Sequence, residues 1–301
     1  MSTGTDIAIR ALQAAEDERT HGRRRGKKPL NVSHIILHVI LAVGALIMAG
    51  PFIWMLLSSL KPLSEIFQQP PSLLPNDWRF DNYARAWEGA DFARGFFNSF
   101  YIATTVTVVS VLTSAMAGYA FARIKFFGRS GLFMTFLATM MVPMQLTIIP
   151  LYIIMGSIGW VDTHLSLIVP PAMFNAFGVF LMRQYVRGIP KELDEAAAID
   201  GASRLRIFVT IILPILRTPM AALGIFTFLS QWNNFFYPLI FLNSPEKFTL
   251  PLVVNQFKGE YASDWTSLMS ACTMAAAPLL ILFIFAQRQI VEGVALSGSK
   301  G

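Results

Sequence analysis

The chain has few charged residues for its length. Charged side chains make up 14% of the 301 residues, whereas 54% are hydrophobic and the mean hydropathy is +0.53. An ordinary soluble domain carries about 25% charged residues. A shortage of charge on this scale excludes a surface that faces water all round, and it indicates an integral membrane protein.

Cysteine is almost absent as well, because Cys272 is the only one in the sequence. A single cysteine cannot form an intramolecular disulfide, so it carries no information about the redox compartment. It falls inside a hydrophobic run, where we expect it to act as a small apolar packing residue.

Six long apolar runs account for the hydrophobic composition. Crossing about 30 Å of hydrocarbon takes roughly 18 or more mainly apolar residues. Backbone groups in lipid must be bonded internally, and barrel strands would be about ten residues of alternating polarity, so these runs predict helices. The predicted spans are residues 34–57, 97–122, 132–155, 165–185, 220–242 and 266–286. The predicted fold class is therefore an all-α polytopic membrane protein with six transmembrane helices.

Charge is also missing from the interior of these runs, since no Asp, Glu, Lys or Arg lies deep inside any of them. Proton- and sodium-driven carriers usually need intramembrane charge. The sequence shows no convincing inverted repeat of the kind found in many secondary transporters. Both absences count against a secondary transporter or facilitator.

Positive charge is unevenly distributed between the loops, although the net charge is only +6. Because positive loops stay in the cytoplasm, this asymmetry predicts that both termini are inside. It also accounts for the net charge without a nucleic-acid partner. Of the 24 Lys and Arg residues, the predicted outer side carries only Lys61, Arg79, Arg85, Arg94, Lys247 and Lys258.

The N-terminus combines a basic tail, residues 1–30, with the first apolar run. This run exceeds 20 residues and has no A-x-A site near its end, so it predicts an uncleaved anchor rather than a signal peptide. We therefore predict a cytoplasmic tail at residues 1–30, followed by a domain embedded in the lipid bilayer at residues 31–301.

Small residues recur every four positions in the second run, at Ser110, Ser114, Gly118 and Ala122. Such a ridge lies on one helix face and lets another helix approach closely, which substitutes for a hydrophobic driving force in lipid. The ridge predicts a helix at the centre of a bundle or at a subunit interface. Packing within the chain alone is the alternative.

A polar stretch, residues 188–219, separates the fourth and fifth runs. We expect it to form a short helix that ends at Gly201, a natural terminator, because alanine is a strong helix former. A second helical segment should end at Pro214 as the chain re-enters the membrane. On these grounds alone, a surface for another protein and a solvated connecting hairpin both remain open. Negative charge complements the N-terminal helix dipole at Glu192, Asp194 and Glu195.

This stretch also resembles a known motif. Residues 193–203 are Leu-Asp-Glu-Ala-Ala-Ala-Ile-Asp-Gly-Ala-Ser, followed by Phe208 and Ile211-x-Leu213-Pro214. The pattern is similar to the EAA motif of type I ABC importer permeases. Two further stretches resemble the carbohydrate branch of that family, the maltose-type permeases: Trp232-Asn233-x-Phe235-x-x-Pro238-Leu239, and Gln287-Arg288-x-x-Val291-x-Gly293 through Gly298-x-Lys300-Gly301. The resemblance covers about residues 30–301.

The resemblance implies the type I ABC importer permease fold in a bacterial-type inner membrane. Residues 195–201 would then form a coupling helix seated in a groove of a cytoplasmic ATPase dimer, where Glu195 meets a basic partner. A second permease subunit and an extracytoplasmic solute-binding protein would complete the transporter. The coupling residues that the motif implies are Glu195, Ala196, Ala197, Asp200, Gly201 and Pro214.

The sequence contains no G-x-x-x-x-G-K-[ST] phosphate loop. The nearest likeness, at residues 293–300, has Ser before Lys and no preceding strand. We therefore predict a non-catalytic subunit that binds no cofactor or metal itself and depends on ATP hydrolysed by its partner.

Two regions are candidates for contact with solute or binding protein. Amides and aromatic faces suit sugar hydroxyls and rings, so the fifth run predicts a substrate path; interhelical hydrogen bonding and packing are the alternative. That path comprises Gln231, Trp232, Asn233 and Asn234. The loop 243–264 corresponds to a family loop that extends toward the binding protein, with Asn255, Gln256 and Tyr261 as candidate contacts.

The predicted function is the transmembrane subunit of a binding-protein-dependent ABC importer for carbohydrates. A secondary transporter or facilitator is the first alternative, and an ABC permease for a non-sugar solute such as glycerol phosphate is another. A membrane scaffold is a third, but it would have no need of a force-transmitting loop.

Overall fold

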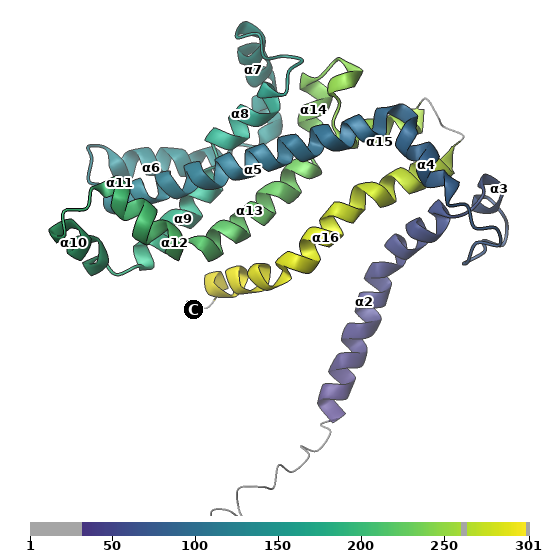
Figure 1. Cartoon of the computed structure of the whole chain (residues 1–301), viewed down its shortest axis with the longest axis horizontal. Coiled ribbons are helices and arrows are strands. Elements are labelled where there is room, and N and C mark those ends of the chain that lie inside the picture. Colours follow the sequence, from purple (N-terminus) through teal and green to yellow (C-terminus); the bar gives the residue numbers. More distant parts are fainter. Residues whose placement is uncertain (1–31, 260–263, 299–301) are drawn as a thin grey trace, which may run out of the picture. The chain divides into compact units, whose positions relative to one another are not determined.

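The computed structural model describes residues 32–259 and 264–298, and every regular element in these ranges is helical (Figure 1). The predicted tail at residues 1–30 lies outside the described residues. The chain divides into two units, residues 1–53 and 54–301. Each unit is described by itself.

The helices α2–α16 follow one another with short η elements between them. η1, η2 and η4 are 3-10 helices, whereas η3 is a π-helix. Their bounds are α2 (Val32–Ser59), α3 (Leu63–Ile66), α4 (Asp81–Glu88), η1 (Gly89–Asp91), α5 (Phe92–Arg123), α6 (Arg129–Ala138), η2 (Thr139–Met141), α7 (Met144–Ser157), α8 (Leu165–Met173), α9 (Ala176–Gly188), α10 (Glu192–Ile199), α11 (Arg204–Ile207), η3 (Phe208–Ile212), α12 (Leu213–Ile215), α13 (Arg217–Trp232), α14 (Phe236–Phe241), η4 (Pro245–Lys247), α15 (Leu250–Gly259) and α16 (Trp265–Gly298).

Helix α2 contains the described part of the first unit, residues 32–53, and its remaining residues begin the second unit. By length and composition, four helical stretches of the described residues can each cross a membrane, and two bent helix pairs can raise that number to six. The four stretches agree with the first, second, fourth and sixth predicted spans: Ile35–Ser59, Phe92–Arg123, Leu165–Gly188 and Trp265–Gln287.

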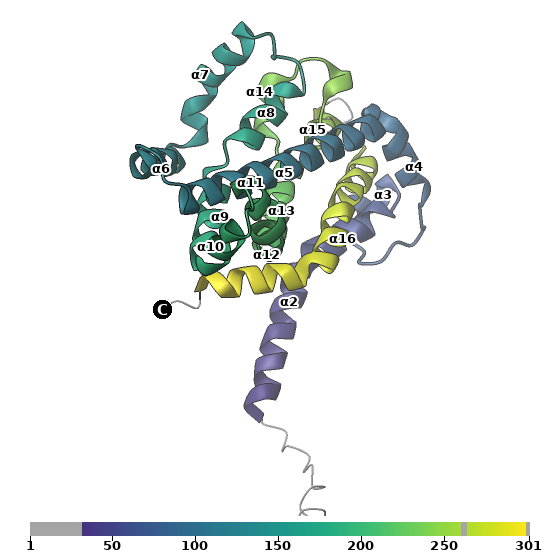
Figure 2. The same cartoon turned by 60° about the vertical axis from the view of Figure 1, so that its left-hand side comes forward.

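The third predicted span, residues 132–155, is divided into two helical parts in the structure. η2 continues α6 and ends at Met141, and α7 begins at Met144. The axis of α7 is turned by 106° from that of the stretch Arg129–Met141 (Figure 2). The residue before a proline avoids the helical region, and Val142 before Pro143 is extended, with φ −85° and ψ 118°. Pro143 therefore ends the first helix and starts the second.

The fifth predicted span, residues 220–242, is also interrupted. α13 ends at Trp232, residues 233–235 form a break, and α14 follows. At its start, α13 is bent by 76° from the preceding helical stretch Arg204–Ile215. The helix α13 is thus shorter than the predicted span, with a bend before it and a break after it.

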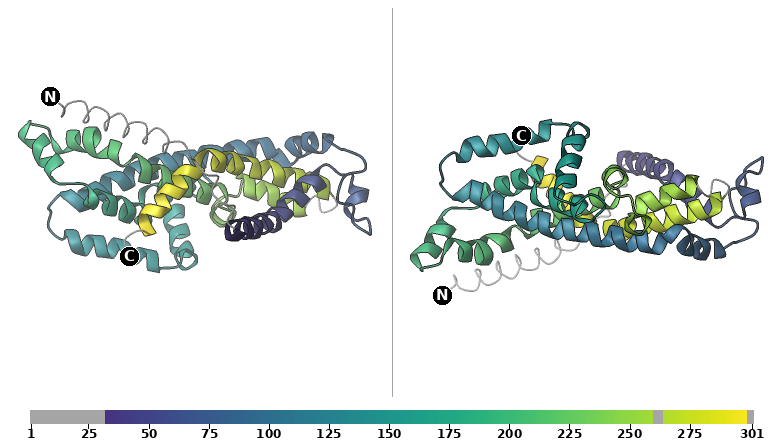
Figure 3. Two further views of the ribbon diagram at one scale, coloured as in Figure 1. Left: turned by 90° about the horizontal axis from the view of Figure 1, so that it is seen from below. Right: turned by 90° about the horizontal axis from the view of Figure 1, so that it is seen from above.

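Helix α5 is the central helix of the second unit and packs against α8, α9, α13 and α15 (Figures 1 and 3). The predicted ridge faces α9 of the same chain. A Cβ on Gly118 would lie 2.6 Å from the Met182 Cβ, and a Cβ on Gly178 would lie 2.4 Å from the Ser114 Oγ. Both glycines are needed because the two backbones approach so closely. The structure therefore shows packing within the chain.

In the second unit, α4 packs against α16. Asn82 of α4 donates to the carbonyls of Ser59 and Lys61 at 2.8 and 2.9 Å. Asp264 accepts the backbone N–H of Ser267 at 3.0 Å, as a helix N-cap does. Burial raises the pKa of Asp264, but hydrogen bonds from Ser267 and Thr266 outweigh it, so the pKa is lowered overall.

Candidate functional site

Helix α10 forms where the polar loop was predicted to be helical. Alanine-rich sequence favours the helix and acidic residues occupy its first turn. Gly201 has φ +82°, its N–H donates to Ala198 O at 3.1 Å, and the N–H of Ala202 donates to Ala197 O at 2.9 Å. These two bonds form a Schellman motif. The prediction that Gly201 terminates this helix is confirmed.

Most of α10 is exposed, and only Asp194 and Ala197 are partly buried. Glu195, Ala196 and Asp200 are exposed, the last as the residue that caps the helix C-terminus. Large apolar side chains are exposed as well, since Ile199 has 86% of its surface accessible and Leu193 has 42%. α10 thus presents polar and apolar side chains outside the long spans.

The segment after α10 packs against α5. Ser203 caps α11 by accepting the N–H of Arg206 at 3.3 Å. The rings of Phe208 and Tyr119 lie 5.3 Å apart between centroids, and Ile212 is fully buried. The loop therefore has one largely exposed helix, α10, and one helix packed on the membrane-spanning bundle.

Pro214 does not end the helical segment, contrary to the prediction. The chain stays helical through the π-helix η3 and through Pro214, which lies in the first turn of α12, and the bend comes at Leu216. Sharp bends in helices are usually found at prolines and π-bulges, and this segment has both. Proline is also tolerated in a first helical turn, where its missing N–H has no partner to lose. Pro214 itself is exposed.

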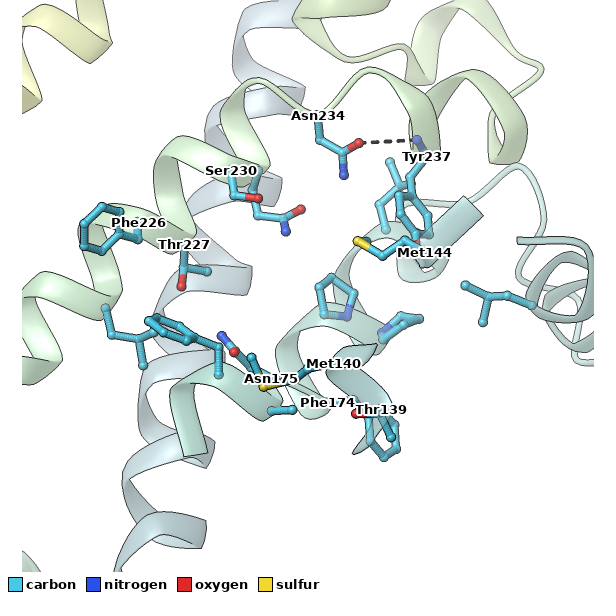
Figure 4. A pocket seen from close by; sticks show the side chains of 18 of the residues that line it. Thr139, Met140, Met144, Phe174, Asn175, Phe226, Thr227, Ser230, Asn234 and Tyr237 are labelled. Atoms are coloured by element: carbon cyan, nitrogen blue, oxygen red, sulfur yellow. Dashed lines mark hydrogen bonds between the residues drawn. The ribbon is translucent and has the colours of Figure 1, made fainter. Parts of the chain in front are cut away.

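A cavity of about 570 Å³ lies between α7, α8, α9, α13 and α14 (Figure 4). Its volume falls within the range of small-ligand sites. None of the described residues that line it is Asp, Glu, Lys, Arg or His. Its polar groups are amides and hydroxyls, and its apolar walls include aromatic rings. The principal side chains are Asn175, Thr227, Ser230, Gln231, Asn234, Phe174, Phe226 and Tyr237.

One wall of the cavity is the break between α8 and α9. Pro170 and Pro171 lie inside α8, which ends at Met173. Asn175 then caps α9, because its Oδ1 accepts the N–H of Gly178 at 2.8 Å. The chain leaves the helical conformation at Phe174, with φ −121° and ψ 63°, so the span is discontinuous near its middle. Irregular backbone at membrane depth is tolerated where it lines a cavity.

Helix α5 holds this break in place. Asn175 Nδ2 donates to Ser110 Oγ at 2.9 Å, and Thr113 Oγ1 donates to Ala172 O at 2.8 Å. The two hydroxyls lie on the helix that also carries the small-residue ridge. The break is therefore fixed to α5 by two side-chain hydrogen bonds.

The structure separates the four residues predicted for the substrate path. Gln231 and Asn234 line the cavity. Trp232 is 2% exposed, and its Nε1 donates to Ala275 O at 3.0 Å on α16. Asn233 donates to Leu229 O at 2.9 Å in its own helix. Neither Trp232 nor Asn233 is among the lining residues.

Several lining residues were missed from the sequence. The useful signal for Asn175 was local, since an asparagine soon after Pro170 and Pro171 suits the cap of a restarted helix. Thr227 and Ser230 gave no signal beyond their spacing on the face of α13 that includes Gln231. Met140 and Met144 lie beside the unforeseen bend between η2 and α7.

The loop predicted to face a binding protein is partly described. Asn255 and Gln256 lie on α15, where Asn255 is exposed, whereas Tyr261 lies outside the described residues. The segment before α15 is held firmly, because Asp162 accepts the N–H groups of Asn243 and Ser244 at 2.9 and 3.0 Å.

Known proteins share this architecture. The fold is that of an ABC importer permease: a chain in the crystal structure of a bacterial ABC transporter involved in the import of the acidic polysaccharide alginate superposes with a TM-score of 0.76 at 24% identity, covering 85% of this chain and 96% of that one. The family model described as binding-protein-dependent transport system inner membrane component matches residues 110–295. The chain belongs to this family of multi-pass membrane permeases.

Two relatives cover nearly all of the chain. The arabinooligosaccharides transport system permease protein AraQ of Halalkalibacterium halodurans is 35% identical over 273 residues, which cover 88% of this chain and 98% of that protein. The lactose transport system permease protein LacG of Rhizobium radiobacter is 33% identical, covering 86% of this chain and 94% of that protein. The similarity therefore extends well beyond the loop motif.

Proposed function

We propose that this chain is the transmembrane subunit of a binding-protein-dependent ABC importer for carbohydrates. The observation that carries the proposal is α10, an exposed helix outside the long spans that ends in a Schellman motif at Gly201. A channel or facilitator needs no such helix. The family assignment and the names of the two relatives support the same function.

The coupling helix is α10, and it docks on a cytoplasmic ATPase dimer. Glu195 and Ala196 are exposed for that contact, and Ile199 adds an apolar side chain. Ala197 faces the bundle, while Asp200 and Gly201 form the turn that ends the helix. Pro214 contributes to the rigid segment that carries motion into the membrane. The chain itself is not an enzyme and binds no cofactor, since the partner hydrolyses the ATP.

The cavity is the substrate path, and we propose that it accepts uncharged saccharides. Gln231 and Asn234 supply amides for sugar hydroxyls, and Tyr237 and Phe226 supply faces for sugar rings. Glycerol phosphate and other anions are disfavoured, because none of the described lining residues carries a positive charge. Trp232 supports α13 from behind by packing on α16. A second permease subunit closes the open side.

Six spans with both termini in the cytoplasm complete the proposed topology in the bacterial inner membrane. The two bent pairs then count as the third and fifth spans. The basic loops, including the one that carries α10, face the cytoplasm. On the outer side, α15 with Asn255 and Gln256, together with Tyr261, faces the solute-binding protein.

Mild purification of this chain tests the proposal. We expect an ATPase and a second permease to co-purify, and a liganded binding protein to stimulate hydrolysis. The variants Glu195→Lys and Gly201→Asp should still insert and accumulate but should uncouple uptake from hydrolysis. A chain that transports solute alone, without an ATPase, would instead establish a secondary transporter or facilitator. Normal uptake by both variants would remove the coupling role of α10.

A further inference from the structure

A buried ion pair joins α10 to the end of α5. Arg123, the last residue of α5, has its Nε 2.7 Å from Asp194 Oδ2, and its Nη2 donates to Ile189 O at 2.6 Å. The two charged side chains are only 7% and 17% exposed. The guanidinium thus binds both the start of the loop and the first turn of α10.

This ion pair is the main polar link between α10 and the membrane-spanning bundle. Asp194 and Ala197 are three residues apart, so they share one helix face, and they are the only partly buried residues of α10. Ala197 adds a small apolar contact against the cluster that contains Val186 and Ile207. In the described part of the chain, α10 makes no other ion pair.

The ion pair between Arg123 and Asp194 is suited to transmitting a displacement from one helix to the other. A small apolar contact such as that of Ala197 can slide, because hydrophobic contact has no preferred direction. The guanidinium of Arg123 is held in place by the directional hydrogen bond that it donates to Ile189 O, and it holds Asp194 by ionic contact. Separating a buried pair leaves uncompensated charges in a medium of low dielectric, so α10 and the end of α5 should move together.

The other end of this connection is the cavity. Arg123 is ten residues from Thr113, or about 15 Å along α5 at 1.5 Å per residue. Thr113 and Ser110 hold the break between α8 and α9 that forms one cavity wall. Figure 1 shows α10 at one end of α5 and the α8–α9 break farther along it. A displacement of α10 that moved α5 would therefore move the cavity wall.

We propose that Arg123 and Asp194 are positioning residues that transmit the displacement of α10 to α5 and, through α5, to the wall of the cavity. The inference rests on the proposed function, because it takes the displacement of α10 from a partner ATPase. It adds to that function the specific pair of side chains through which the displacement reaches the membrane.

Accessibility of the cavity tests this without knowledge of the transported solute. Cys272 is the only cysteine, so C272S removes it and S230C places a single thiol on the cavity wall. The purified transporter complex is treated with a water-soluble maleimide, with and without ATP and vanadate. We expect nucleotide to change the labelling rate about tenfold in this background.

In the same background, D194N and R123Q should reduce the nucleotide effect to less than about twofold. R123K should retain part of it, because lysine keeps the charge but has no guanidinium that can reach Asp194 and Ile189 O at once. The control E192Q removes an exposed charge from the same helix and should keep the full effect. The double variant R123Q/D194N should reduce the nucleotide effect no further than the single variants do, as expected for residues that act as one unit.

Full nucleotide-dependent labelling in both D194N and R123Q, with the ATPase bound, would overturn the inference. A loss of the nucleotide effect that only follows the amount of assembled complex would also overturn it, since the pair would then have only a structural role. Co-purification of an ATPase is scored separately in every variant. Its absence from the unsubstituted chain would refute the proposed function and this inference together, whereas its presence with unaltered coupling refutes only the inference.

Discussion

The two ends of α5 are held in different ways. At the end near α15, Asn98 donates to Phe248 O at 2.9 Å, and Ser99 Oγ accepts the N–H of Leu250 at 2.8 Å. The same segment is held from the other side by Asp162, which also pairs with Lys247 Nζ at 2.8 Å. Several hydrogen bonds of different origin thus fix the α15 end.

The end near α10 is linked to the polar loop by one charged side chain. Arg123 makes the polar links, to Ile189 O and to Asp194, and α10 itself is otherwise exposed. A network of many bonds resists displacement in every direction, whereas a single directional joint transmits displacement of the helix it holds. The difference suggests that the α15 end is an anchor and that the α10 end receives motion.

The largest effect should come from the middle of α5, which connects both ends. Gly118→Ala places a Cβ 2.6 Å from the Met182 Cβ and 2.8 Å from the Arg183 N. Overpacking of this kind costs about 1–3 kcal/mol, and the upper end applies because a backbone atom must shift. We expect a clear fall in Tm in detergent. Gly131→Ala, with no atom within 4 Å of its Cβ, is the control, and equal Tm values would contradict close α5–α9 packing.

The anchor at the α15 end is tested by Ser99→Ala. The variant leaves the N–H of Leu250 without its 2.8 Å acceptor in a buried place. An unsatisfied buried donor costs about 1–3 kcal/mol. Tm should fall, and amide exchange near Leu250 should quicken. Ser157→Ala removes an exposed hydroxyl that bonds its own helix and should change neither. If both variants behave alike, the anchor is weaker than its geometry suggests.

The Asp162 clamp adds a pH dependence to the same end. Hydrogen bonds from the side chains of Lys247 and Ser244 hold the pKa of Asp162 well below its usual range. A carboxyl with a lowered pKa stabilises the fold above its unfolded pKa of about 4 and loses that contribution as pH falls toward the folded value. Asp162→Asn should therefore lower Tm modestly at pH 7 and should flatten the decline of Tm below pH 4. If Tm declines below pH 4 as steeply in Asp162→Asn as in the unsubstituted chain, the hydrogen bonds of Asp162 do not stabilise this end.

The smallest effect should be at Gly201, at the α10 end. Alanine in the left-handed region, at φ +82°, costs about 1–2 kcal/mol, and α10 is exposed enough to fray instead of destabilising the bundle. We expect faster amide exchange within α10 and little change in Tm. Gly188→Ala, where no positive φ is needed, should leave the exchange unchanged. A large fall in Tm would mean that α10 is integral to the core, which would erase the contrast between the two ends.

Local features were predictable from neighbouring residues. The glycine end of α10 was expected from the conformational freedom of Gly201. Four spans followed from apolar length alone. The sequence did not show that the helix of the third span ends before Pro143, because a proline can kink a helix without ending it. The continuation through Pro214 depends on a π-helix, which has no clear sequence signal.

The sequence by itself determined the membrane class, most of the helical spans and the loop motif, since these depend on composition and on residues close together in the chain. Only the tertiary structure decided which polar residues face the cavity, because rotation of α13 turns Gln231 inward while Trp232 packs on α16. It also decided the partner of Asp194. Arg123 lies 71 positions earlier in the sequence, and only the packing of α9 against α5 brings the two charges within 2.7 Å.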